Sequence, residues 1–170
     1  MIEIKPAIST DAPKLAQYMA MRFKDTFGHI YDPQDLADFL DAKYNSEVTL
    51  KHIETPEHFI RIAWEDDEIK GYIFGGPMSL PFENYAKDAF EIYRFYVSDD
   101  QKGNGLAPKL YNELLQHVKN IATSELFLGV WSLNERALGF YKKLGFEIVG
   151  KYLYQVGKTL DDERIMRLKL

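Results

Sequence analysis

The hydrophobic positions in the first part of the chain recur at the spacing of helices. A short strand is expected over residues 2–8. Apolar residues then repeat about every fourth position over residues 10–27, which puts them on one face of a helix. Ser9 or Thr10 is the expected N-cap of this helix, because a side-chain oxygen there can accept from an unpaired N–H group.

A second helix is expected to open at Asp32-Pro33, because proline is favoured in the first helical turn. Residues 46–54 predict a third, short helix. The apolar side chains of the second helix should lie inside and its acidic side chains outside, namely Leu36, Phe39 and Leu40 against Asp35, Asp38 and Asp41.

Strand patterns replace helical ones in the middle of the chain. Phe59–Trp64 and Ile69–Gly75 flank a turn at Asp66-Asp67 and should form a hairpin. The glycine and proline residues within 75–81 predict a loop. Ala89–Val97 predicts a further strand with interleaved tyrosines.

Helices and strands alternate in the second half of the chain. Gly145 follows the last expected helix, at a position where a left-handed C-cap is common. The expected order is helix 106–121, strand 125–131, helix 134–144, strand 146–156 and strand 162–170. With no repeat or linker, this pattern predicts a single α/β domain over residues 1–170 with mixed strand pairing.

Composition limits the classes of function. The 170 residues are 46% hydrophobic and 14% aromatic, which predicts a globular protein, and a net charge of −5 argues against nucleic acid as the main partner. Cysteine is absent, which excludes disulfides, thiolate metal sites and an acyl-cysteine intermediate. The scattered histidines suggest no metal site. Without a signal-like start or a membrane-length apolar stretch, a soluble cytoplasmic protein with no membrane partner is expected.

The most informative segment runs from Val97 to Leu110. It reads as a strand end, a glycine-rich loop with Gly103 and Gly105, and then an amphipathic helix. Glycines let the backbone approach a ligand, and the helix N-terminus presents unpaired N–H groups, an arrangement that suits phosphate. An ordinary surface loop before a helix has the same pattern, so this segment alone does not establish a phosphate-binding site.

A second segment, Asn134 to Phe146, follows about thirty residues later. Together and in this order the two segments resemble the acyl-CoA-binding elements of the GNAT superfamily of N-acetyltransferases. The resemblance covers nearly the whole chain. It implies the GNAT fold, with a central mixed, mostly antiparallel sheet flanked by helices. It also implies acetyl-CoA as co-substrate, a small-molecule amine as acceptor, no metal, and a homodimer.

In the family register the glycine-rich loop departs from the usual pattern at two places. Lys102 replaces the usual glutamine or arginine, and Pro108 removes one N–H donor. The resemblance implies that the loop surrounds the CoA pyrophosphate, with Gly103, Asn104, Gly105 and Ala107 around it and Lys102 as counter-charge.

The strand before the loop has a chemical role in the same family. The resemblance implies that the backbone of Phe95, Tyr96 and Val97 pairs with the pantetheine arm. It also implies that a bulge turns the Phe95 N–H toward the thioester carbonyl. Glu91 is the expected general base, because an alkylammonium group with a pKa of about 10.4 must lose its proton before it attacks. Alternatively, Glu91 is a solvated strand residue or an ion-pair partner.

Asn134 and Tyr141 are seven residues apart, two turns along one helix face, with the small Ala137 between them. In the family the asparagine bonds the pantetheine arm and the tyrosine protonates the departing CoA thiolate. Tyr141 is therefore the expected general acid. A packing role for Tyr141 and a capping role for Asn134 are the alternatives.

The sequence identifies the acetyl donor better than it identifies the amine acceptor. Phe23-Lys-Asp-Thr-Phe27 and Glu91-Ile-x-Arg94-x-Tyr96-Val97, among other segments, resemble the PaiA-type acetyltransferases, which are associated with spermidine and spermine. That resemblance makes a polyamine the expected acceptor, bound by Tyr31, Asp32 and Tyr93. The alternatives are a peptide or protein acceptor, which needs an open groove between the early helices and the last hairpin, and a non-catalytic acyl-CoA-binding module.

Overall fold

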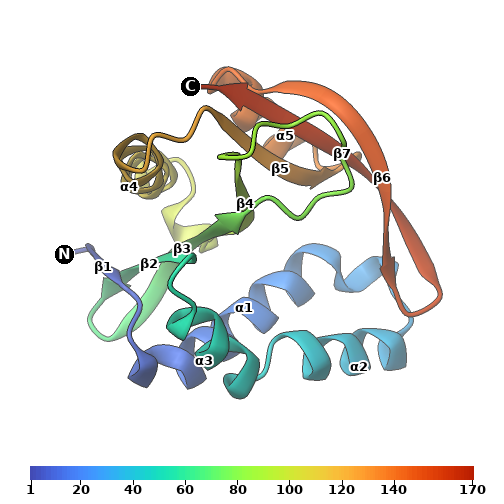
Figure 1. The fold of residues 1–170 in the computed structure, drawn as a ribbon. Coiled ribbons are helices and arrows are strands. Elements are labelled where there is room, and N and C mark those ends of the chain that lie inside the picture. Colours follow the sequence, from blue (N-terminus) through green and yellow to red (C-terminus); the bar gives the residue numbers. More distant parts are fainter.

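A computed structural model describes all 170 residues as a sheet with helices on both faces (Figure 1). The elements are β1 (Glu3–Pro6), α1 (Ala12–Phe27), α2 (Pro33–Lys43), α3 (Ser46–Glu54), β2 (Phe59–Glu65), β3 (Glu68–Pro77), β4 (Phe90–Val97), α4 (Leu106–Asn120), β5 (Glu125–Trp131), α5 (Glu135–Lys143), β6 (Glu147–Val156) and β7 (Thr159–Lys169). No helix is both long enough and apolar enough to cross a membrane.

The seven strands form one sheet in the order β1-β2-β3-β4-β5-β7-β6. Every neighbouring pair is antiparallel except β4 and β5, which confirms the predicted mixed, mostly antiparallel pairing. The β4–β5 pairing is short, joining only Phe90–Ile92 to Leu126–Leu128. Beyond these residues the two strands have no ladder between them, so the sheet opens in its middle.

Two hydrophobic cores lie on the two faces of this sheet. One packs α4 onto the central strands through fully buried residues such as Leu110 and Leu114. The other packs α1 onto β2 and β3 through residues such as Leu15, Met19 and Tyr72. The split between β4 and β5 therefore sits inside a sheet that is held on both faces by well-packed apolar residues.

Two sequence predictions about the first half of the chain are wrong in detail. Neither Ser9 nor Thr10 caps α1, because both lie in a short 3-10 turn that precedes it. β3 continues to Pro77 instead of ending in a loop at Gly75. A β carbon at Gly75 would lie 2.6 Å from the Glu91 carbonyl oxygen on β4, so this glycine marks a close approach of two strands and not a turn.

Candidate active site

Two cavities meet where β4 and β5 part. The first, here called the aromatic cavity, has a volume of about 390 Å³, and the second, the basic cavity, about 360 Å³. Neither is lined by one element alone. Five residues belong to the walls of both cavities, namely Phe95, Tyr96, Asn134, Ala137 and Tyr141. The structure thus brings the predicted strand and the predicted helix together at one junction.

A bulge in β4 shapes this junction, as predicted. Phe74 of β3 is opposite Arg94, while the next residue, Gly75, is opposite Ile92, so Tyr93 is the extra residue on β4. Ile92 faces the core under α4, and after the extra residue Phe95 packs against that same core. The bulge lets Tyr93 and Arg94, adjacent in sequence, both line the aromatic cavity.

Three cationic side chains, Arg22, Lys102 and Arg136, line the basic cavity. Lys102 forms an ion pair with Asp99, and the Arg22 guanidinium lies 3.6 Å from the same carboxylate. Neither Arg22 nor Arg136 was predicted from the sequence. Arg136 stands in the first turn of α5, two residues after the predicted Asn134, so its place in the motif was visible in the sequence.

The glycine-rich loop adopts the conformation that only glycine takes easily. Gly103 has φ 85° and Gly105 has φ 81°, and Gly105 is the N-cap of α4. Neither glycine donates its N–H to a backbone group. Asn104 differs, since its N–H donates to the Gln101 carbonyl and its side chain to the Asp100 carbonyl. Lys102 and Ala107 line the basic cavity, whereas Gly103, Asn104 and Gly105 do not.

Aromatic side chains make up half of the wall of the aromatic cavity. Only three charged residues stand among them, namely Glu91, Arg94 and Glu163. The aromatic members are Phe23, Phe27, Tyr31, Tyr44, Tyr93, Phe95, Tyr96, Trp131, Tyr141, Tyr152 and Tyr154.

Glu91 is buried, with 5% of its surface exposed, and forms no ion pair, which excludes the two alternative interpretations of this residue. Its Oε2 accepts three hydrogen bonds, from the Ser79 N–H at 2.7 Å, the Ser79 hydroxyl at 2.9 Å and the Leu80 N–H at 3.1 Å. Burial raises the pKa of Glu91, and these hydrogen bonds oppose the rise. Glu91 is therefore a fixed carboxylate at the cavity wall.

Glu163 is a second carboxylate on the wall of the aromatic cavity, and it was not predicted from the sequence. Its side chain has no hydrogen bond or ion pair within the protein. Burial, together with the neighbouring charges of Asp161 and Asp162, raises the pKa of Glu163 to about 7. The acidic run Asp161-Asp162-Glu163 was visible in the sequence. Because β7 begins at Thr159 and not at 162, Asp161 and Glu163 share one face of a strand.

Tyr141 is 8% exposed, and its hydroxyl bonds no other protein group. Burial raises the pKa of Tyr141 far above its usual value, so the hydroxyl stays protonated. Asn134 caps α5, since its Oδ1 accepts from the Ala137 N–H at 3.1 Å, and its amide nitrogen makes no hydrogen bond. The capping interpretation of Asn134 is thus correct, and it leaves two N–H donors free at the junction.

The three residues expected to bind the acceptor are placed differently. The Tyr31 hydroxyl donates to Asp161, and the Tyr93 hydroxyl donates to the Pro77 carbonyl at 2.5 Å; both tyrosines line the aromatic cavity. Asp32 does not line it. Its carboxylate accepts from the N–H groups of Gln34 and Asp35, because it is the N-cap of α2.

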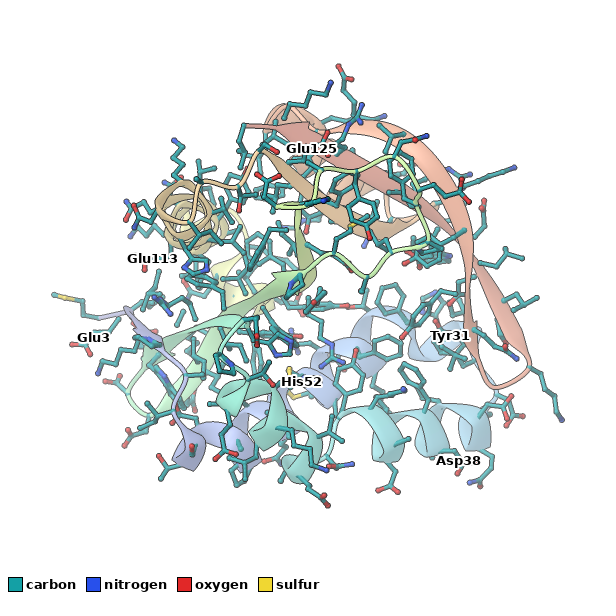
Figure 2. All side chains as sticks on the ribbon, viewed as in Figure 1. Glu3, Tyr31, Asp38, His52, Glu113 and Glu125 are labelled. Carbon is teal, nitrogen blue, oxygen red and sulfur yellow. The ribbon has the colours of Figure 1, made fainter.

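The β6–β7 hairpin reaches over the early helices (Figure 1). Figure 2 shows Tyr31 between α2 and this hairpin, while Asp38 points away from the sheet on the outer side of α2. The Lys158 N–H, at the hairpin tip, donates to Asp35 at 3.0 Å. Together with the bond between Tyr31 and Asp161, this contact bridges the groove that a peptide acceptor would need to be open.

Comparison with known proteins identifies the family. A family model described as the acetyltransferase (GNAT) family matches residues 19–146. An uncharacterized N-acetyltransferase of the pepI 3′ region in Lactobacillus delbrueckii subsp. lactis is 26% identical over 169 residues, covering 99% of this chain and 98% of the relative. An L-methionine sulfoximine/L-methionine sulfone acetyltransferase of Pseudomonas paraeruginosa is 33% identical over 106 residues, covering 61% of this chain and 59% of the relative.

Solved structures agree with these sequence matches at the level of the fold. The PaiA N-acetyltransferase of Thermoplasma acidophilum, solved in complex with coenzyme A, superposes with a TM-score of 0.80 at 21% identity and covers 100% of this chain and 99% of its own.

Proposed function

The chain belongs to the GNAT family of acetyltransferases and uses acetyl-CoA as its co-substrate, and from this premise we propose that it transfers the acetyl group directly to a small primary amine. The observation behind this proposal is the junction of the two cavities. Acetyl-CoA enters through the basic cavity and the amine through the aromatic cavity, so that both reach Tyr141.

The basic cavity suits the phosphates of CoA. Arg22, Lys102 and Arg136 supply positive charge. The free N–H groups of Gly103 and Gly105, at the N-terminus of α4, supply donors for the pyrophosphate. In this proposal Asn104 shapes the loop through its bonds to Gln101 and Asp100, and the loop backbone and Ala107 contact the ligand.

The pantetheine arm then runs along the edge of β4 that β5 leaves unpaired. The backbone of Phe95, Tyr96 and Val97 offers hydrogen bonds there, as a strand partner would. The Asn134 amide reaches the arm from α5. In this proposal the Phe95 N–H, next to the bulge, stabilises the oxyanion that forms when the amine attacks the thioester carbonyl.

Proton transfer needs a base and an acid on opposite sides of the reacting carbon. Glu91 removes the proton of the ammonium group, directly or through a water molecule, and Glu163 holds that ammonium group in the cavity. When the tetrahedral intermediate collapses, the C–S bond breaks and Tyr141 gives its proton to the CoA thiolate, while the attacking nitrogen loses its second proton, which restores the Tyr141 hydroxyl through water. The raised pKa of Tyr141 keeps that proton available.

The bridged groove favours a small acceptor over a peptide. The contacts of Lys158 with Asp35 and of Tyr31 with Asp161 leave an acceptor site bounded by the hairpin. Spermidine or spermine stays a candidate acceptor within this proposal, and Glu91 and Glu163 are the carboxylates that would bind it. Asp32 lies outside the cavity wall and is not part of such a site.

The direct test is thiol release from acetyl-CoA across a panel of amines, including spermidine, free amino acids, simple alkylamines and a short peptide. Because the chain has no cysteine, the protein adds no thiol background. Turnover with small amines supports the proposal, and turnover with the peptide alone contradicts it. CoA binding without turnover by any amine would favour the non-catalytic alternative. A homodimer and a cytoplasmic location remain predictions, the first of which sedimentation velocity would test.

A further inference from the structure

Arg94 is the exception among the six arginines of the chain. Four of them form ion pairs with carboxylates, namely Arg22, Arg61, Arg164 and Arg167. Arg136 is exposed to solvent. Arg94 is half-buried and has no carboxylate partner, although it lines the aromatic cavity.

The surroundings of Arg94 hold its guanidinium in place and leave its donors free. The guanidinium carbon lies 4.2 Å from the centre of the Tyr44 ring and 5.8 Å from that of Phe74, so the group stacks on aromatic faces. Its one polar contact is with the Met19 sulfur at 3.7 Å, and a thioether is a weak acceptor. A planar fork of N–H groups, fixed by stacking and open to a cavity, is suited to bidentate binding of a carboxylate.

A half-buried charge without a partner costs free energy, because burial removes part of its hydration. Packing alone does not require the charge, since an apolar side chain of similar length could fill the space beside Tyr44 and Phe74. An anion bound from the cavity would offset the cost. A CoA phosphate does not fit this position, because Arg94 lines only the aromatic cavity, whereas the cations proposed to bind phosphate line the basic one.

We propose that Arg94 binds a carboxylate of the acceptor, so that the substrate is a small amine that also carries an acid group, such as an amino acid. This inference rests on the proposed function and names the substrate class of the same site. Arg94 stands on β4 and Glu163 on β7, with β5 between them. The cavity therefore offers a cation for the carboxylate and the carboxylates of Glu91 and Glu163 for the ammonium group.

This charge pattern separates two kinds of acceptor. A zwitterion pairs with groups of both signs, whereas spermidine brings several positive charges toward Arg94 and pays like-charge repulsion. The aromatic wall suits an apolar side chain on such an acceptor. Arg94 is thus a specificity-determining residue under this proposal, and the reacting nitrogen stays with Glu91.

The test compares acceptors that differ only by a carboxylate: phenylalanine with phenethylamine, leucine with isoamylamine, and γ-aminobutyrate with propylamine, each against spermidine. The ratio of kcat/KM within a pair is measured for the wild type, R94M, R94K and R61M. Arg61 is the matched control, since its guanidinium lies 4.3 Å from the Phe59 ring but lines neither cavity. A folding defect lowers both members of a pair equally and leaves their ratio unchanged.

We expect the wild type to prefer the carboxylated member of at least one pair. R94M should lower kcat/KM for that member about 10- to 100-fold, the usual worth of a charge-assisted hydrogen bond, with little change for its decarboxylated partner. R94K should retain part of the preference, and R61M all of it. If the decarboxylated amines or spermidine turn over as well as the acids in the wild type, or if R94M leaves the ratio unchanged, the role of Arg94 is overturned while the proposed function stands. If no amine of any kind turns over, the proposed function fails and this inference fails with it.

Discussion

The basic and the aromatic cavity differ in how their walls arise from the sequence. The basic cavity is built mainly from residues 95–107 and 134–141, two short stretches in which the order of strand, glycine-rich loop and helix is visible along the chain. Only β4 contributes a long continuous run to the aromatic cavity, Glu91–Tyr96, and the other lining residues come in ones, twos or threes from α1, both ends of α2, the loop before β4, β5, α5, β6 and β7. A binding site built from local backbone geometry can be recognised as a sequence motif. A binding site built by tertiary packing comes from residues that are scattered along the sequence.

The largest expected effect is at the junction that both cavities share. Tyr141→Phe should lower kcat about 10²- to 10⁴-fold, because the thiolate then departs without a proton donor. Stability should change little, since the hydroxyl bonds no other protein group. Coenzyme A binding, measured by calorimetry, should stay near that of the wild type. Unchanged kcat with normal CoA binding would remove Tyr141 from the chemistry.

Glu91→Gln and Glu163→Gln should separate proton transfer from acceptor binding within the aromatic cavity. E91Q should lower kcat about 10²-fold, since the base is lost. E163Q should raise KM for the amine roughly tenfold, because one charge-assisted contact to the ammonium group is lost. Steady-state kinetics of both variants with one amine check this. If E163Q lowers kcat and E91Q raises KM instead, the general base is Glu163.

A backbone change in the glycine-rich loop beside the basic cavity should weaken the binding of coenzyme A but not of the amine. Gly105→Ala forces an alanine to φ 81°, which costs roughly 1–2 kcal/mol and should raise the Kd for coenzyme A several-fold. Gly139→Ala is the matched control, because Gly139 lies in α5 with free space around it and a normal φ. Calorimetry measures Kd, and kinetics measure KM for the amine. An equal rise in both constants for G105A would mean that the two cavities are not independent.

The pH dependence of kcat/KM for the amine should be set by Glu163 in the aromatic cavity. Because the pKa of Glu163 is about 7, protonation below this pH removes the charge that holds the ammonium group, and kcat/KM for the amine should fall as the pH drops through 7. In E163Q this limb should disappear. The KM for acetyl-CoA should not follow the same curve. If kcat/KM of E163Q still falls as the pH drops through 7, a group other than Glu163 is responsible for the fall.

The smallest effect concerns stability. The pKa of Glu163 is higher in the folded chain than in the unfolded chain, so the folded state binds more protons between about pH 4.5 and pH 7, and the free energy of unfolding falls as the pH rises through this window. E163Q should therefore match the wild type near pH 4.5 and exceed it at pH 8 in denaturant melts. If E163Q is less stable than the wild type at pH 8, the ionised Glu163 carboxylate must have a stabilising partner in the folded chain, and this would contradict the structure.

Most of the fold was accessible from the sequence, because its elements have strong periodic signals. The order of elements and the bounds of β5 and α3 agree with the prediction. The failures have physical causes. Gly75 was predicted to begin a loop, although its lack of a side chain allows the close contact with β4. Ser9 and Thr10 have the chemistry of caps but lie in a 3-10 turn.

The candidate site was accessible only in part. The junction residues Asn134 and Tyr141 were predicted because the resemblance to the GNAT family gives roles to two residues that stand seven apart on one helix face. Glu163 was missed, because nothing local shows that β7 brings a carboxylate to the opening beside β4. Asp32 was expected to bind a polyamine acceptor, and its actual role as a helix cap could have been inferred from the proline that follows it.

The central claim is that both substrates are bound at once and meet at the junction of the two cavities. Initial rates measured while acetyl-CoA and the best amine of the panel are varied against each other test it most directly. Direct transfer predicts lines that intersect in the double-reciprocal plot, because a ternary complex must form before the acetyl group moves. Parallel lines, with release of coenzyme A before the amine is added, would indicate an acetylated enzyme and contradict the account.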